Sequence, residues 1–138
     1  MTGWKVAVVE PYTMQRRGLV QLLTELPGAD VVFQGAQVAQ LFRWVRSAPQ
    51  SMRPDAAVLS VSESAGVEAA LTSIASLQGV VPRIVIMADA RSASLVGRLE
   101  RAGVAAVISK TDSVDRVWRV FHSLTQPSFV PPGAGGDR

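Results

Sequence analysis

Short apolar runs rich in valine and isoleucine recur along this chain. They lie at Val6–Val9, Val31–Phe33, Ala56–Leu59, Ile84–Met87 and Val104–Ile108. Nearly every position in these runs is apolar, without the alternation of a strand that has one face in water. Such runs are typical of strands that are buried on both faces, as in a parallel sheet. The pattern therefore predicts five buried strands.

Apolar residues with helical spacing fill the segments between these runs. Positions three and four residues apart share one side of a helix, so each stripe predicts a helix that buries that side. We expect Trp44, which lies beside its stripe, to be partly exposed. The stripes consist of Met14, Leu19, Leu22, Leu23 and Leu26, of Val38, Leu41, Phe42 and Val45, of Val67, Ala70, Leu71 and Ile74, of Leu95, Val96, Leu99 and Ala102, and of Val114, Val117, Trp118 and Phe121.

Local signals separate the predicted helices from the predicted strands. Gly103 follows its helix as a C-terminal cap glycine would, and Asp112 or Ser113 can cap the start of the last helix. Strands and helices that alternate five times predict an α/β fold, a doubly wound five-stranded parallel sheet in the flavodoxin-like order 2-1-3-4-5. We expect residues 4–124 to form this domain. The Pro/Gly-rich segment 125–138 reads as a linker or tail.

Composition excludes several classes of protein. The 138 residues are 48% hydrophobic and 18% charged, which is the balance of one globular domain and not of a disordered chain. The chain has no cysteine, which excludes disulfides and thiolate metal sites, and its net charge of +3 does not by itself indicate nucleic-acid binding. No apolar run could cross a bilayer and the N-terminus does not resemble a signal peptide. We therefore expect a cytoplasmic domain that binds neither membrane nor nucleic acid.

Candidate chemistry lies at the carboxyl ends of the predicted strands, where doubly wound sheets carry their sites. The first, third, fourth and fifth runs each end next to such candidate residues. These residues are Glu10-Pro11, Ser60, Ala88-Asp89 and Lys110.

Several segments resemble the receiver domain of NarL/FixJ-type response regulators of the LuxR family, which has a CheY-like fold. The similar segments are VAVVEPYTMQRRGL, RPDAAVLSV, RIVIMADA and AGVAAVISK, and the resemblance covers about residues 4–124. Its most specific pieces are Arg17-Gly18-Leu19, Pro54-Asp55 and Ala102-Gly103 leading to Ser109-Lys110. The resemblance implies a domain that takes a phosphoryl group from a histidine kinase onto an aspartate, beside Mg²⁺ held by that aspartate and an acidic pair.

The same resemblance implies that this chemistry is lost here. The acidic pair is Glu10-Pro11, the acceptor position is Ser60, the hydroxyl position is Ala88, and only Lys110 is retained. One glutamate and one serine hydroxyl make a poor cage for Mg²⁺, which prefers carboxylates among its oxygen ligands. The only histidine, His122, falls on the last predicted helix, so no base activates Ser60. We expect a degenerate phosphorylation pocket with no metal, no cofactor and no catalytic residue, and hence no enzyme.

Two charged groups beside this pocket allow alternative interpretations. Lys110 is either a relic of phosphate binding or a counter-charge for Glu10, and we favour the counter-charge because a half-buried lysine needs a carboxylate. Glu63 and Asp89 could complete a divalent-cation site with Glu10. We interpret both as solvated loop charges.

These observations predict an atypical, phosphorylation-independent receiver that controls a transcription factor through dimerisation or contact with an effector domain. We expect a homodimer and, in the full-length protein, a C-terminal helix-turn-helix DNA-binding domain. The candidate dimer surface carries both signs of charge on the last two helices. Its basic residues are Arg98, Arg101, Arg116 and Arg119. The alternative is a small-ligand-binding, flavodoxin-like domain that uses the pocket near Glu10, Ser60 and Lys110.

Overall fold

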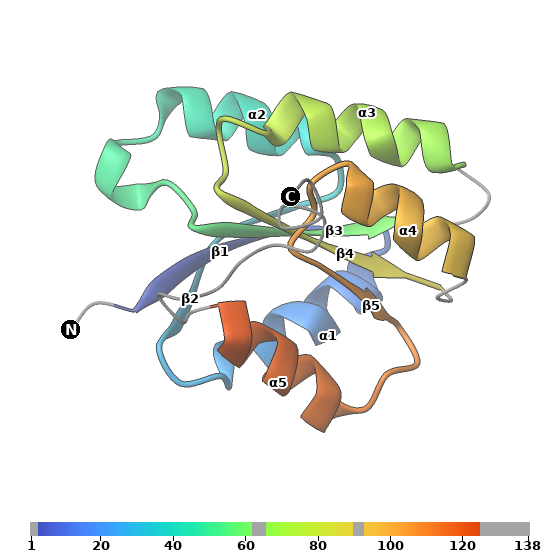
Figure 1. Cartoon of the computed structure of the whole chain (residues 1–138). Coiled ribbons are helices and arrows are strands. Elements are labelled where there is room, and N and C mark those ends of the chain that lie inside the picture. The colour runs from blue at the N-terminus through green and yellow to red at the C-terminus, as the bar shows by residue number, and fades with distance from the viewer. Residues whose placement is uncertain (1–2, 62–65, 90–92, 125–138) are drawn as a thin grey trace.

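A five-stranded parallel sheet lies between two layers of helices in the computed structural model, which describes residues 3–61, 66–89 and 93–124 (Figure 1). The strands follow the order β2-β1-β3-β4-β5, and all neighbours pair in parallel. This arrangement confirms the predicted α/β, doubly wound fold. The strands are β1 (Trp4–Val9), β2 (Ala29–Gly35), β3 (Ala56–Val61), β4 (Arg83–Ala88) and β5 (Ala106–Ser109).

The helices divide between the two faces of the sheet. Helices α2 (Val38–Ser47), α3 (Val67–Leu77) and α4 (Ala93–Arg101) cover one face, and α1 (Thr13–Thr24) and α5 (Val114–Leu124) cover the other (Figure 1). A short 3-10 turn, η1 (Gln50–Met52), precedes β3. In the described part of the chain, no helix is long and apolar enough to cross a membrane.

The three central strands have the two buried faces that their continuous apolar runs predict. In β3, Val58 packs with the α1 and α5 layer, whereas the next residue, Leu59, packs with the layer of α2, α3 and α4. Neighbouring β4 repeats this division with Val85 and Ile86. Successive side chains of a strand point to opposite faces, so each residue contributes to one of two separate cores.

Strand β2 differs from this prediction. Its residues Val31, Val32 and Phe33 are only partly buried. β2 is an edge strand that pairs with β1 alone, and it is less buried than the other edge strand, β5. The last strand is also shorter than its apolar run: β5 begins at Ala106, and Val104 is buried in the turn before it.

Three residues assigned to buried helix stripes are exposed instead: Met14 at 86%, Val114 at 55% and Trp118 at 38%. Met14 lies five residues before the buried Leu19, which places it about 140° away around α1. In α5 the buried line runs through Val117, Phe121 and Leu124, leaving Val114 and Trp118 at its margin. The predicted stripes were therefore too wide at these two helices.

Other local predictions are confirmed. Gly103 has a φ of +99°, and its N–H donates to the carbonyl of Glu100 at 3.0 Å, as expected for a glycine that ends α4. The Ser113 hydroxyl accepts the backbone N–H of Arg116 at 3.1 Å and so caps α5. Trp44 is partly exposed, with its ring centroid 5.4 Å from that of Phe33 on β2.

Candidate functional site

The candidate site lies at the carboxyl edge of the sheet, where the predicted residues meet. Glu10, Pro11, Ser60 and Lys110 line one cavity of about 190 Å³ between the ends of β1 and β3 and the helices α2 and α3. Ala88 is buried at the end of β4 and contributes its carbonyl, which accepts the N–H of Lys110 at 2.8 Å. Parallel strands bring these residues together because all of their carboxyl ends share one edge.

Glu10 is a buried carboxylate, with 1% of the residue exposed. Its Oε2 accepts the backbone N–H of Tyr12 at 2.8 Å, and its Oε1 lies 3.8 Å from the Lys110 ammonium. Its backbone carbonyl accepts a hydrogen bond from Nη1 of Arg16 at 2.9 Å. The predicted pairing of Glu10 with Lys110 is therefore confirmed.

Asp89 supplies a second carboxylate to the same lysine, which corrects its interpretation as a solvated loop charge. Its Oδ1 lies 3.2 Å from Nζ of Lys110, although its side chain is half-exposed. The adjacency of β4 and β5 explains the contact, because Ala88 pairs with Ser109 and the next residue of each strand follows at the same edge. The predicted strand order already made β4 and β5 neighbours, so this contact could have been predicted from it. Glu63, the other acidic residue considered for this edge, lies outside the described residues.

The cavity offers Mg²⁺ an unsuitable set of ligands. Among the described residues, the carboxylates of Glu10 and Asp89 lie at this edge, and both face the Lys110 ammonium. Among the residues that the structure describes, no three histidine or acidic side chains are grouped to hold a metal ion. Mg²⁺ favours carboxylates among its near-octahedral oxygen ligands, and the described lining of this cavity contains one carboxylate, that of Glu10.

Ser60 lines the cavity without a partner that could activate it. Its hydroxyl forms no hydrogen bond within the described part of the chain. His122 lines a different hollow with Trp4 and Leu26, next to the start of β1 and so toward the opposite edge of the sheet. A serine hydroxyl needs an adjacent base to act as a nucleophile, and within the described part of the chain no base is hydrogen-bonded to Ser60.

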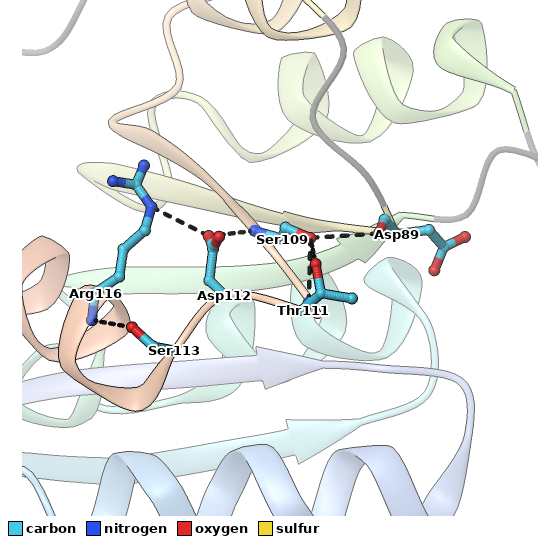
Figure 2. A network of polar contacts seen from close by, with 6 residues as sticks. All are labelled: Asp89, Ser109, Thr111, Asp112, Ser113 and Arg116. Atoms are coloured by element: carbon cyan, nitrogen blue, oxygen red, sulfur yellow. Dashed lines mark hydrogen bonds and ion pairs between the residues drawn. The ribbon is translucent and has the colours of Figure 1, made fainter.

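A polar network holds the loop that carries Lys110 (Figure 2). The Asp112 carboxylate accepts the backbone N–H of Ser109 at 2.8 Å and Nε of Arg116 at 3.2 Å. The Ser109 hydroxyl accepts the N–H of Thr111 at 3.1 Å and donates to the carbonyl of Asp89 at 3.3 Å. These bonds tie β5, α5 and the end of β4 together around Lys110. The sequence analysis considered Asp112 only as a helix cap and did not identify this role.

The four arginines of the predicted dimer surface have different environments. Arg98 pairs with Glu68 of α3 at 2.5 Å, and Arg116 pairs with Asp112. Arg101 and Arg119 are exposed. In addition, α4 and α5 lie on opposite sides of the sheet (Figure 1). Two of the four arginines thus form ion pairs within the chain, and the surface itself stays a prediction.

No protein-family model and no curated protein matches the chain. Solved structures do. The signal receiver domain of the putative response regulator NarL from Mycobacterium tuberculosis matches with a TM-score of 0.68 and 18% identity, over 88% of this chain and 95% of that one. The RcsB response regulator of Salmonella typhimurium matches with a TM-score of 0.76 and 12% identity, over 97% of this chain and 65% of that one.

A third similar structure comes from another functional class. The pilus assembly protein CpaE from Caulobacter crescentus matches with a TM-score of 0.72 and 13% identity, over 90% of this chain and 95% of that one. Identities this low establish the fold alone. The chain has the CheY-like receiver-domain fold of NarL- and LuxR-type response regulators.

Proposed function

We propose that this chain is a receiver domain that works without phosphorylation and controls a transcription regulator through self-association or contact with an effector domain. One observation carries the proposal. The Lys110 ammonium, the one group of the family's phosphoryl chemistry retained at its position, is neutralised by Glu10 and Asp89. A phosphoryl group at this edge would have to compete with two carboxylates that are already in place.

The charges at the site support the same proposal. Glu10, Asp89 and Lys110 together carry a net charge of −1 when all three are ionised, so the edge disfavours a further anion. Ser60 stands at the acceptor position and would form a stable phosphate ester in place of a labile acyl phosphate. Such an ester would require a separate kinase and phosphatase, and this site holds no group that performs either reaction.

The regulatory output is proposed from similar proteins. The structure of RcsB is described in terms of DNA interaction, and its chain extends well beyond the part that this chain covers. We propose that the full-length protein has a C-terminal DNA-binding domain, which residues 125–138 join to the receiver domain. We also propose that the protein is cytoplasmic. The CpaE match shows that the same fold also serves in a pilus assembly protein.

The alternative of a small-ligand-binding domain has less support. The cavity that Ser60 lines measures about 190 Å³, below the roughly 300–1,000 Å³ of most ligand sites, and the hollow of about 330 Å³ on the other side of Glu10 and Lys110 does not include Ser60. The two charged residues of its described lining, Glu10 and Lys110, already pair with each other. A receiver domain that acts through self-association or contact with an effector domain therefore explains the site better than a ligand-binding domain.

Phosphorylation by a small donor tests the proposal. The purified chain is incubated with acetyl phosphate and Mg²⁺, and its intact mass is measured beside that of a Pro11→Asp/Ser60→Asp variant, which rebuilds the acidic pair and the acceptor. We expect no mass gain in the parent chain and a labile phosphoryl group on the rebuilt variant. A gain of one phosphoryl group in most of the parent chains, absent from a Ser60→Ala variant, would overturn the proposal.

A further inference from the structure

Helix α2 and the turn that follows it carry three arginines and no acidic residue. Segment 31–54 contains Arg43, Arg46 and Arg53 but no lysine, aspartate or glutamate, whereas the rest of the chain holds 11 basic and 11 acidic residues. The whole net charge of +3 therefore lies in this segment. Arg43 and Arg46 belong to the helix, and Arg53 follows η1, which connects α2 to β3 (Figure 1). We call these three residues the α2 basic surface.

The charges of the α2 basic surface are not neutralised within the described part of the chain. All three arginines are exposed, and they form no ion pair there, in contrast to Arg98 and Arg116. The nearest acidic residue along the sequence is Asp55, whose carboxylate accepts the backbone N–H of Lys5 at 2.8 Å. Three positive charges are thus available to an external anionic partner.

Apolar and aromatic side chains accompany these charges. The guanidinium of Arg46 lies over the ring of Phe42, 5.7 Å from its centroid, and this cation–π contact restricts its motion. Trp44 is partly exposed and packs against Phe33 on β2. Met52, in η1 next to Arg53, is 41% exposed. The surface therefore offers apolar area beside its positive groups.

These residue types are typical of a contact with another protein. Protein interfaces are enriched in arginine, methionine and aromatic residues and depleted of lysine, aspartate and glutamate. Arginine also binds a carboxylate through two parallel hydrogen bonds, which a lysine cannot form. Surfaces that bind DNA are more polar and much more strongly basic than protein interfaces. An acidic protein segment therefore fits the α2 basic surface better than a nucleic acid does.

We propose that the α2 basic surface binds an acidic segment of a partner protein, in which two or more carboxylates flank an apolar side chain. The carboxylates pair with Arg43 and Arg46, which are three residues apart and so are neighbours on the helix. The apolar side chain contacts the exposed apolar groups beside them, among which Met52 is the most exposed. Charge complementarity determines the partner, because the surface has no negative group of its own.

The α2 basic surface lies apart from the phosphorylation pocket. Val38, the first residue of α2, lines the cavity with Glu10 and Ser60, whereas the arginines lie in the second half of the helix and beyond it. A helix between two parallel strands runs back from the carboxyl edge of the sheet toward the opposite edge. A partner can therefore bind here whatever happens at the pocket, and its binding does not depend on the function proposed above.

Selection of short random peptides displayed on phage, with the whole chain as the bait, tests this surface. We expect the enriched peptides to carry several acidic residues beside an apolar one. An enriched peptide is then labelled with fluorescein, and its affinity for the chain is measured by fluorescence anisotropy. Arg43→Glu/Arg46→Glu should weaken binding by about tenfold or more, because it places like charges against the peptide. Met52→Ser should weaken binding to a smaller extent, and replacing the acidic residues of the peptide by their amides should abolish it.

The matched control is Arg101→Glu/Arg119→Glu, which changes the net charge equally at two exposed arginines of α4 and α5 and should leave the affinity unchanged. Thermal melting followed by circular dichroism verifies that each variant is folded. The surface is wrong if no peptide is enriched, if the enriched peptides lack acidic residues, or if the control weakens binding as much as Arg43→Glu/Arg46→Glu does.

The same measurement distinguishes other anionic partners. A short DNA duplex and phosphatidylserine vesicles are titrated against the parent chain and against Arg43→Glu/Arg46→Glu. We expect both to bind the parent more weakly than the peptide does. If either binds more tightly and loses that binding in the variant, the α2 basic surface serves a nucleic acid or a membrane, and the assignment to an acidic protein segment is wrong.

Discussion

The Lys110 ammonium lies 3.8 Å from the carboxylate of Glu10, joining the end of β5 to the end of β1 across the intervening strands β3 and β4. Glu10 is buried, and its carboxylate would lose the ion pair with Lys110 if that lysine were removed, since Arg16 donates to its backbone carbonyl instead. A lysine that contacts phosphoryl oxygens in related receivers thus balances a buried charge here.

Lys110→Ala should destabilise the fold by about 1–3 kcal/mol at neutral pH, because it leaves the Glu10 carboxylate buried and uncompensated. Urea denaturation measures the change. The matched control is Asp89→Asn, which removes the half-exposed partner and should cost less than about 1 kcal/mol. A Lys110→Ala protein as stable as the parent would show that the pair contributes nothing.

A double-mutant cycle isolates the pair itself. If Glu10 and Lys110 interact, the cost of Lys110→Ala should be smaller in a Glu10→Gln background than in the parent. Equal costs in both backgrounds would mean that the lysine acts through other contacts.

Asp112→Ala should destabilise the β5–α5 loop. Its carboxylate is mostly buried and accepts bonds from the Ser109 N–H and from Arg116, and unsatisfied buried donors cost about 1–3 kcal/mol (Figure 2). We also expect faster hydrogen exchange at the Ser109 amide. Ser113→Ala is the comparison, since it removes the α5 cap at about 1 kcal/mol without touching that amide. Unchanged exchange at Ser109 in the Asp112 variant would contradict this account.

Two glycine-to-alanine substitutions should act in opposite directions. Gly18 lies within α1 with nothing within 4 Å of an added Cβ, so Gly18→Ala should stabilise the fold by about 0.5–1 kcal/mol. Gly103 has a φ of +99° and its Cβ would lie 2.7 Å from Nε2 of Gln78. Gly103→Ala should therefore destabilise the fold by about 1 kcal/mol or more. Melting temperatures that move in the same direction for both would refute the distinction.

The core strands and the site could be predicted from the sequence because each depends on local chemistry. Apolar runs such as Ala56–Leu59 favour burial on both faces, and a doubly wound sheet then places Glu10, Ser60 and Lys110 at one edge. The partial exposure of β2 depends on the strand being at the edge of the sheet, which periodicity does not reveal.

Long-range pairs were the hardest to foresee. Arg98 binds Glu68, which lies 30 positions earlier in the chain, and Lys110 binds Asp89 through the adjacency of two strands. Neither contact produces a periodic pattern in the sequence. The sequence analysis therefore interpreted these residues as solvated or as parts of a surface. The exposure of Trp118 likewise follows from how α5 is rotated against the sheet, which its apolar spacing leaves open.

The most direct test of the account measures self-association with and without a phosphoryl donor. Sedimentation equilibrium of the chain in Mg²⁺ is compared before and after addition of acetyl phosphate, and again with beryllofluoride as a phosphoryl mimic. A receiver that works without phosphorylation should associate with the same constant under all three conditions. If either addition shifts the monomer–dimer equilibrium of the parent chain and leaves a Ser60→Ala variant unchanged, the central claim is wrong.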